Sequence, residues 1–417
     1  MAINQPQTLK GFRDFLPVEK RKRDFVAQKV REIFEIFGFE PLETPTLEYA
    51  SLLLGKYGQE ADKLIYSFKD RGEREVALRY DQTVPSARVL AQYQNVLPKY
   101  FRRYQIQNVF RADNTQKGRY REFTQCDIDI FGSTSPVADA EILATTYFAF
   151  KNVGYPEIKL LVNDRQILFL TLKSFAKSEA EIMSLIQSID KLDKIGRSEV
   201  AKEIEKKELL SYDKATKVIE AIENRKNKPP TANLQEIIEY AVKLGVPKKD
   251  IIFTSRLARG LDYYTGMIFE VSLPGYGAGS CGGGGRYDKL IDQLGGVDIP
   301  AVGIAFGFDR MMDAAEELGI IPTENIGTQV LVTIFDPNLI YNSLTVAEKL
   351  RQAKIKTELY PAIDKLDKQL KYADKIKVPY VVIIGPEEVK KNIVKVKNMK
   401  TGEQKEYTID DFIKFQI

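Results

Sequence analysis

The sequence predicts a protein of two or three domains that mixes helices and strands, with a helical insert and a compact α/β domain at its C-terminal end. Three observations support this prediction. The chain has 417 residues, and domains average roughly 150 residues. Segments with alternating polar and apolar residues lie between residues 99 and 132, as is typical of strands in a sheet. The last ~90 residues alternate strand-like and helix-like segments, which indicates a mainly parallel or mixed sheet.

The first domain is expected to open with a helix from Pro17 to about Phe37. Apolar residues recur there at helical spacing, and Gly38 supplies a stop signal. A strand is expected at 39–45, followed by a second helical stretch. Extended regions are expected at 99–132 and 158–163, a further strand from 251 and a helix from near 307.

The stretch from about 170 to 248 is expected to be a helical insert. Its positive and negative charges nearly balance, and Ile182, Leu185, Ile186 and Ile189 fall at helical spacing. The segment Asn227–Pro230 interrupts it. A new alternating pattern starts after Pro322, so we place the domain boundary between residues 326 and 327.

The positive charge of the chain is concentrated in its last segment. Residues 327–417 contain 16 Lys and Arg against 12 Asp and Glu, which accounts for the whole net charge of +4, because residues 1–326 contain 46 of each. A solvated lysine-rich face explains such an excess about as well as a module that contacts nucleic-acid phosphates. The charge alone does not choose between these explanations.

Composition excludes several kinds of catalysis. The chain has no histidine, which rules out Ser-His-Asp and Cys-His mechanisms and His-ligated metal sites. Its two cysteines, Cys126 and Cys281, are too few for a disulfide framework or a four-cysteine zinc site, which favours the cytoplasm. We expect no membrane span and no targeting segment. The chemistry therefore falls to carboxylates, arginines, lysines and backbone groups.

Two neighbouring extended segments carry polar residues at alternate positions. These residues are Arg103, Gln105, Gln107 and Arg111 on the first segment, and Phe123, Gln125, Asp127 and Asp129 on the second. An exposed hairpin would show such a face too. However, the other face of the second segment is apolar, so this sheet packs, and we expect the polar face to form the floor of a cleft. The loop 112–121 between the segments is basic, which suits contact with a polyanion.

Three further segments each have an ordinary structural explanation when taken alone. Arg259 precedes a glycine and is followed by the pair Tyr263-Tyr264, which packing would explain. Seven glycines occur in the eleven residues 275–285 without the Gly-Lys-Ser/Thr of a phosphate loop. A flexible turn is at least as good an explanation there as a ligand cradle. Arg310 lies one turn into the last expected helix of the first domain.

In order and spacing, these segments together resemble the motifs of class II aminoacyl-tRNA synthetases as arranged in the histidyl-tRNA synthetase family. The matching segments are 8–17 for the family's opening, 39–50 for motif 1 with Pro45 at the dimer-facing position, 110–129 for motif 2 and 303–310 for motif 3. RGLDYYTG at 259–266 and GGGGRYD at 282–288 are similar to two signatures of the histidyl enzymes. The resemblance covers nearly the whole chain.

The resemblance implies a fold and an assembly. It implies an α+β catalytic domain with an antiparallel sheet of the class II synthetase kind over 1–326, with the helical insertion at about 170–248 near the acceptor stem of the tRNA. It also implies an α/β anticodon-binding domain over 327–417, a cytoplasmic location and a homodimer.

The reaction implied is activation of L-histidine by ATP to histidyl-adenylate and pyrophosphate, followed by transfer to the 3′ end of tRNA(His). Mg²⁺ is expected mainly with the nucleotide, and we expect no zinc, no other metal site and no prosthetic group. The attacking carboxylate is already ionised near neutral pH, so no general base is required. Fixed positive charge around the α-phosphate is the main requirement.

By resemblance, Arg259 and Arg111 are the catalytic residues, and Arg111 and Arg310 bind ATP at its α- and γ-phosphates. The expected histidine-binding residues are Asp81, Thr83, Arg111, Gln125, Asp129, Arg259, Tyr263 and Tyr264. The expected contacts to the tRNA acceptor end are Gln116, Lys117 and Arg119. Asp81 and Asp129 stand where many bacterial members have glutamate, which preserves the charge.

Two other functions stay open at this point. A catalytically inert, synthetase-like regulatory subunit of ATP phosphoribosyltransferase would keep the histidine pocket but lose the arginine of RGLDYYTG and the anticodon domain. A non-enzymatic RNA-binding protein would explain the basic last segment but not the polar strand faces.

Overall fold

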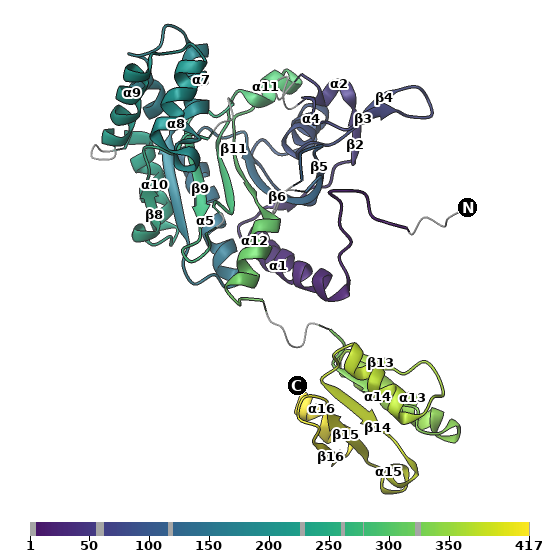
Figure 1. Cartoon of the computed structure of the whole chain (residues 1–417). Helices are drawn as coiled ribbons and strands as arrows, with labels where there is room; N and C mark the ends of the chain where they lie inside the picture. The colour runs from purple at the N-terminus through teal and green to yellow at the C-terminus, as the bar shows by residue number, and fades with distance from the viewer. Residues whose placement is uncertain are drawn as a thin grey trace. The chain divides into compact units, whose positions relative to one another are not determined.

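The computed structural model describes residues 6–55, 62–115, 120–225, 230–259, 263–277, 279–321 and 327–416 (Figure 1). The chain divides into two compact units, one formed by 1–14 with 23–320 and the other by 15–22 with 321–417. No described helix is long and apolar enough to cross a membrane.

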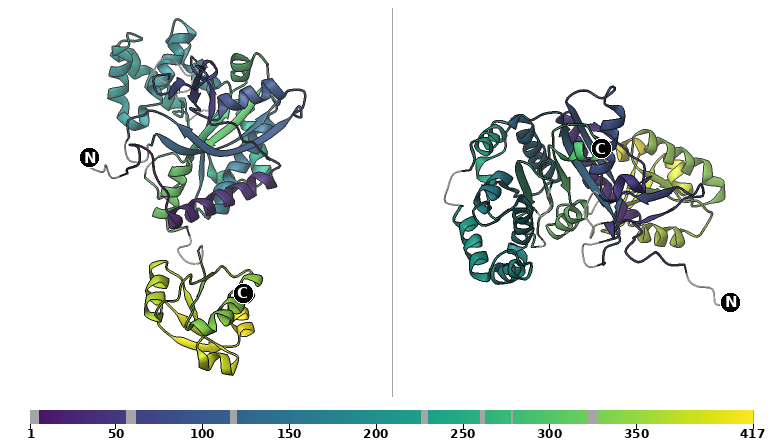
Figure 2. Two further views of the ribbon diagram at one scale, coloured as in Figure 1. Left: turned by 90° about the vertical axis from the view of Figure 1, so that its right-hand side faces the viewer. Right: turned by 90° about the horizontal axis from the view of Figure 1, so that it is seen from above.

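An eight-stranded sheet forms the centre of the first unit (Figures 1 and 2). In sheet order its strands are β1 (Glu40–Pro41), β5 (Phe101–Phe110), β6 (Glu122–Phe131), β11 (Ala301–Phe306), β10 (Gly282–Arg286), β9 (Met267–Ser272), β7 (Lys159–Asp164) and β8 (Ile251–Phe253). The six central strands run antiparallel, and β1 and β8 are parallel additions at the two edges. The implied antiparallel sheet is therefore confirmed.

One face of this sheet is apolar and is covered by α1 (Pro17–Ile36) and α5 (Pro136–Val153). Phe34 of α1 packs on Tyr104 and Phe306, with ring centroids 5.7 and 5.4 Å apart. Phe150 of α5 packs on Phe306 at 5.7 Å. Because side chains alternate between the faces of a strand, burying this face leaves the polar residues of β5 and β6 on the other. The predicted first helix is confirmed, and α1 ends one residue before Phe37.

Helices also fill most of the described residues between 170 and 248, as predicted. The remaining helices of this unit are α2 (Ala50–Leu53), α4 (Thr83–Tyr93), α6 (Arg165–Leu172), α7 (Glu179–Ile189), α8 (Leu192–Lys206), α9 (Tyr212–Asn224), α10 (Ala232–Lys243), η2 (Lys248–Asp250), α11 (Leu290–Gly295) and α12 (Phe308–Glu317). Ile182, Leu185, Ile186 and Ile189 are buried as their spacing indicated. Helix α10 packs on α5.

Two sequence expectations differ from the structure. The strand expected over 39–45 is reduced to Glu40–Pro41, and Leu42 N makes one further backbone hydrogen bond, to Tyr104 O at 2.9 Å. Beyond it, Thr44 bonds to side chains of β5 instead: Gln105 Nε2 donates to its Oγ1 at 2.8 Å. The glycine-rich stretch is not only a turn, because Gly282–Arg286 form the buried strand β10 inside the sheet.

A second, three-stranded antiparallel sheet lies in the same unit. Its order is β2 (Leu47–Tyr49), β4 (Glu75–Leu78) and β3 (Ser67–Lys69). It follows the short strand β1 in the chain and carries part of the segment that resembles motif 1.

The second unit contains a five-stranded mixed sheet, in agreement with the predicted α/β pattern. In sheet order the strands are β13 (Thr357–Leu359), β12 (Val330–Val332), β14 (Tyr380–Ile383), β15 (Val394–Asn398) and β16 (Gln404–Tyr407), and the first three are parallel. Its helices are η3 (Pro337–Leu339), α13 (Ile340–Gln352), α14 (Leu366–Lys375), α15 (Pro386–Lys391) and α16 (Ile409–Gln416). Val330, Val382, Leu350 and Phe412 belong to its buried core.

Candidate active site

The polar face of the main sheet has a defined register. Arg103 of β5 lies opposite Asp129 of β6, and Gln107 lies opposite Gln125. On the next strand, β11, Gly303 lies opposite Asp129. Residues opposite each other in antiparallel strands share a face, so the alternating polar residues of the sequence meet on one surface.

Glycines make this surface hollow where the polar side chains lie. A Cβ atom on Gly283 of β10 would stand 1.9 Å from Nη1 of Arg259. A Cβ on Gly303 would stand 1.8 Å from Oδ1 of Asp129. Both glycines are therefore required so that another side chain can lie directly over the backbone.

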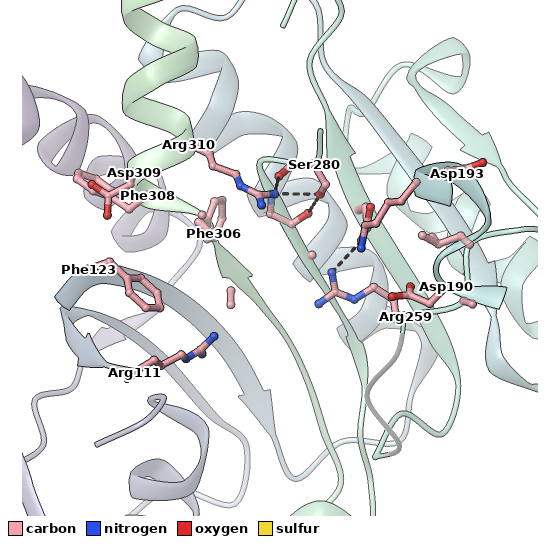
Figure 3. Close-up of a pocket in the computed structure, with 18 of the residues that line it drawn as sticks. Arg111, Phe123, Asp190, Asp193, Arg259, Ser280, Phe306, Phe308, Asp309 and Arg310 are labelled. Atoms are coloured by element: carbon pink, nitrogen blue, oxygen red, sulfur yellow. Dashed lines mark hydrogen bonds and ion pairs between the residues drawn. The ribbon is translucent and has the colours of Figure 1, made fainter. Parts of the chain in front are cut away.

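A cavity of about 710 Å³ opens on this face. Its lining brings together Arg111, Arg259 and Arg310, which come from the end of β5, the segment before β9 and helix α12 (Figure 3). Figure 3 shows these arginines entering the cavity from three sides. Three guanidinium groups around one cavity favour a polyanionic ligand such as a nucleotide phosphate chain.

Arg259 is held closely in an unusual conformation. Its backbone has φ of 52°, a left-handed value that is uncommon outside glycine. Its Nη1 donates to Oε1 of Glu270 at 3.0 Å, and its Nη2 donates to the Tyr264 hydroxyl at 3.4 Å. Burial alone would lower the pKa of Arg259, but the neighbouring Tyr264 and Glu270 raise it. The guanidinium therefore stays charged.

Two buried polar side chains hold the backbone at and before Arg259 through hydrogen bonds to its carbonyl oxygens. Arg165 Nη1 donates to the carbonyl oxygens of Ala258 and Arg259 at 3.0 and 3.1 Å. Asn163 Nδ2 donates to the carbonyl of Leu257 at 2.8 Å. These hydrogen bonds stabilise the left-handed turn that directs Arg259 into the cavity.

Arg111 and Arg310 are oriented by contacts of different kinds. The Arg111 guanidinium lies 4.4 Å from the ring centroid of Tyr80 and 5.1 Å from that of Phe123. Arg310 Nη1 donates to the carbonyl of Ser280 at 2.8 Å. Both arginines keep donors that a ligand can use, because a guanidinium has five.

The neighbouring carboxylate Asp309 is neutralised by the N-terminal segment. Its Oδ1 accepts from Arg13 at 2.9 Å and from Arg23 at 2.6 Å. Arg23 also donates to Oγ1 of Thr124 on β6 at 3.0 Å. The start of the chain thus links α12 to the strand that carries Gln125 and Asp129.

Asp129 lies on the same sheet face, next to a cluster of tyrosines. Its Oδ1 accepts a short hydrogen bond from the Tyr287 hydroxyl, and its Oδ2 forms an ion pair of 2.6 Å with Arg103. The Tyr287 ring is 5.8 Å from Tyr263, which is 4.7 Å from Tyr264. Since Tyr264 also contacts Arg259, the expected histidine-binding side chains form one continuous set with that arginine.

Asp81 and Thr83 approach this set from the start of α4. Thr83 is the first residue of the helix, and Asp81 Oδ1 accepts from the backbone N–H of Val84 at 3.2 Å. The Asp81 charge contributes to raising the pKa of Tyr263, after the larger effects of burial and Tyr264. Gln125 is buried on β6 and donates to Oδ2 of Asp127 at 2.8 Å.

The residues expected at the tRNA acceptor end, Gln116, Lys117 and Arg119, lie outside the described residues. Conversely, the structure adds residues that sequence reasoning did not assign to the site: Arg103, Asp127, Glu270, Gly283, Gly303, Tyr287 and Asp309. Most lie inside segments that the sequence had already singled out. Their roles depend on the register between strands, which no single segment specifies.

Comparisons with known proteins agree with one another. The histidyl-tRNA synthetase family model matches residues 11–311, and the anticodon binding domain model matches residues 329–416. The histidine–tRNA ligase of Cytophaga hutchinsonii is 37% identical over 453 residues, covering 99% of this chain and 99% of that protein. The crystal structure of histidyl-tRNA synthetase from Nostoc sp. PCC 7120 has a TM-score of 0.84 at 32% identity, covering 99% of this chain and 100% of that chain.

A further similar structure concerns the regulatory alternative. A Bacillus halodurans protein described as an ATP phosphoribosyltransferase regulatory subunit/histidyl-tRNA synthetase has a TM-score of 0.73, covering 88% of this chain and 97% of that one. At 22% identity this likeness shows the fold alone.

Proposed function

The chain belongs to the histidyl-tRNA synthetase family, and from that premise we propose how its described residues divide the work of the reaction. The activity is that of a histidine–tRNA ligase: histidine is activated with ATP and transferred to tRNA. The regulatory-subunit alternative is not favoured, because the chain carries Arg259, Arg111 and the anticodon-binding domain.

We propose that Arg111, Arg259 and Arg310 bind and activate the nucleotide, and the observation that supports this is their convergence on one cavity. Adenylate formation brings a carboxylate to the α-phosphate, so negative charge accumulates on the phosphoryl oxygens. Arg111 would hold the α-phosphate and the substrate carboxylate, and Arg310 the γ-phosphate. Arg259 would stabilise the transferring centre.

The histidine side of the site is proposed to lie around Asp129. An ionised carboxylate can accept a hydrogen bond from an imidazole N–H, and its two oxygens offer about four acceptor positions. Tyr263 and Tyr264 would cover the ring, Gln125 would lie beside it, and Asp81 with Thr83 would hold the substrate ammonium. A buried polar site of this kind rejects side chains that cannot pair with it.

Mg²⁺ is proposed to arrive mainly on the nucleotide. Two of the carboxylates that line the cavity are already paired: Glu270 with Arg259 at 3.0 Å, and Asp309 with Arg13 and Arg23. Among the residues that the structure describes, no group of three or more Asp, Glu, Cys or His side chains could hold a metal ion. When bound, the ion would neutralise phosphate charge.

The wider assembly is also a proposal. Residues 1–326 would form the catalytic part and 327–417 the anticodon-binding part, while Gln116, Lys117 and Arg119 would contact the acceptor end of tRNA(His). A cytoplasmic location and a homodimer belong to the same proposal, and the homodimer is supported by exposed apolar residues around the motif 1 segment. Leu47, Tyr49 and Phe68 of the small sheet are 45, 61 and 47% exposed, and a second copy would bury them.

The assignment of the substrate is tested by ATP–pyrophosphate exchange with each of the twenty amino acids. We expect exchange with histidine alone, because the other side chains leave Asp129 and its tyrosines without a matching partner. Comparable exchange with glutamine or asparagine would contradict the proposed pocket. If no amino acid supported exchange, the result would favour the alternative of a catalytically inert regulatory subunit.

The position of the Arg259 guanidinium can be tested by substituting Gly283, over which it lies. Gly283→Ala is expected to lower the adenylation rate by ~10–10²-fold, since the new Cβ displaces the guanidinium and misplacement of about 1 Å can cost that much. The flexible end of Arg259 can move aside, so the fold should be retained. Gly277→Ala is the matched control, because a Cβ there meets nothing within 4 Å. Equal rates for the two variants would show that Arg259 acts elsewhere.

A further inference from the structure

One buried charged group on the floor of the site has no role in the reaction as described so far. Arg103 is completely buried, and Asp127 beside it is 3% exposed. The Arg103 Nη2 atom lies 2.6 Å from Oδ2 of Asp129 and 3.8 Å from Oδ2 of Asp127. One cation therefore lies between two carboxylates, of which only Asp129 is proposed to contact the substrate.

The register of the sheet fixes this arrangement. Arg103 is directly opposite Asp129, and Gln105 is directly opposite Asp127, so all four side chains lie on the face that carries the cavity. Arg103 Nη1 also donates to Oε1 of Gln105 at 3.3 Å. Asp127 receives its hydrogen bond from Gln125 at 2.8 Å. The two aspartates therefore have different partners and share only the arginine.

Burial and the charge of Arg103 act in opposite directions on the pKa of both aspartates. Burial raises the pKa of Asp127 to about 8, and Arg103 acts in the opposite direction. Burial also raises the pKa of Asp129, and Arg103 again opposes it. The pKa of Arg103 stays high despite burial, because Asp129 and Asp127 both favour its charged form. The nearby Tyr287 and Asp81 also raise the pKa of Arg103, by smaller amounts.

We propose that Arg103 is a positioning residue for histidine recognition: it keeps Asp129 ionised and aimed at the imidazole, while the second carboxyl, Asp127, lies farther from the arginine. This inference rests on the proposed role of Asp129. A buried carboxylate without a cationic partner takes up a proton rather than remain charged. A protonated Asp129 loses one acceptor position and the charge that attracts an imidazole N–H.

The geometry explains how one arginine serves this purpose without touching the substrate. Arg103 occupies Oδ2 of Asp129 and Tyr287 occupies Oδ1, which fixes the plane of the carboxylate. Each oxygen keeps a second lone pair for the ligand. On the adjacent strand, Gly303 leaves the space into which the Asp129 side chain leans. The carboxylate is thus oriented from both flanking strands.

The first experiment replaces the cation. Arg103→Gln is expected to raise the histidine KM in ATP–pyrophosphate exchange by about 10–100-fold, the range expected for losing a hydrogen bond to a charged group. The ATP KM should change by less than about threefold, because Arg111, Arg259 and Arg310, which are proposed to bind the nucleotide, are unchanged. Arg103→Lys retains the charge but not the fork geometry, so an intermediate effect is expected.

Arg102→Gln is the matched control. It lies on the same strand but on the opposite face, and it also forms an ion pair, with Glu141 at 2.8 Å. We expect its histidine KM to match that of the wild type. Thermal unfolding of both variants reports on the fold separately. Equal effects of Arg103→Gln on the KM values of histidine and ATP would overturn the proposal.

The decisive comparison removes the second carboxylate as well. Asp127→Asn alone is expected to have a small effect, and Arg103→Gln combined with Asp127→Asn should bind histidine as well as Arg103→Gln alone. The pKa of Asp127, raised to about 8, leaves this group mostly protonated at neutral pH, so the amide removes little charge beside Asp129. A merely structural role predicts a further loss, because a second buried bond is lost. If Arg103→Gln does not fold, Arg103→Lys with and without Asp127→Asn gives the same comparison.

Asp129→Asn separates this inference from the proposed function. A large rise in the histidine KM for Asp129→Asn without any rise for Arg103→Gln would overturn the role of Arg103 and leave the histidine pocket in place. A wild-type histidine KM for Asp129→Asn would instead overturn the pocket itself. Loss of histidine binding in both variants, with no further loss when Asp127→Asn is added to Arg103→Gln, is the expected result.

Discussion

Replacing Arg259 by alanine is expected to lower the rate of adenylate formation by ~10²–10³-fold, the usual cost of removing one donor to a developing negative charge. The proposed interaction would be strongest when the carboxylate attacks the α-phosphate, so the transition state should lose more than the bound substrates do. Histidine binding should change much less, because Asp129 and the tyrosines remain. Single-turnover adenylation, measured beside calorimetric histidine binding, separates the two effects.

Arg259→Lys is the informative second variant. Its ammonium keeps a charge at the site, but it cannot reproduce the planar group that pairs with Glu270 and lies over Gly283. Partial rescue is therefore expected. Arg197→Ala serves as a control, because this arginine of α8 is exposed and pairs with Glu223. An unchanged single-turnover rate in Arg259→Ala would remove Arg259 from catalysis.

Much of the fold could be predicted from the sequence, because periodicity and stop signals are local. Helix α1 and strands β5 and β6 appear where the spacing of apolar residues placed them. The alternating strand and helix pattern of the last segment is also confirmed. In each case the spacing of apolar residues within one segment indicates which face is buried.

Strand β10 could not be recognised in the same way. Its residues Gly282–Arg286 carry no alternating side chains, and glycine is unfavourable in strands. The reason for four successive glycines lies in other segments: Arg259 covers Gly283, and the backbone of Gly303 lies 2.0 Å from the position of a Cβ on Gly284. A sequence pattern reports a residue's own preferences and not those of its neighbours across a sheet.

The candidate site could likewise be predicted from the sequence only in part. The polar residues of β5 and β6 were visible as alternation, but which of them pair depends on the register. The family resemblance supplied Arg111, Arg259, Arg310 and Asp129, and the structure brings the three arginines to one cavity. It could not supply Arg103 or Tyr287, whose importance follows from their contacts with Asp129.

The carboxylate of Asp129 is the group on which histidine selection is proposed to depend, and its charge can be removed without changing its shape. Asp129→Asn is expected to raise the histidine KM by on the order of 10²-fold, because losing a charged, buried hydrogen-bond acceptor costs roughly 2–3 kcal/mol. The ATP KM should stay nearly unchanged. Pyrophosphate exchange at saturating concentrations of each substrate in turn measures both values.

Alanine at this position would be a poorer test, because it would leave Arg103 as a buried cation without its main partner and could unfold the protein. Asparagine keeps one oxygen, which can accept from Arg103 in place of Oδ2, so the buried arginine retains an acceptor while the charge is lost. Asparagine also has N–H donors, which would face the imidazole N–H that the carboxylate is proposed to accept. Selectivity should therefore fall together with affinity, and histidine should lose its advantage over other amino acids in exchange. If the ATP and histidine requirements instead rose equally, Asp129 would be supporting the sheet rather than contacting the imidazole.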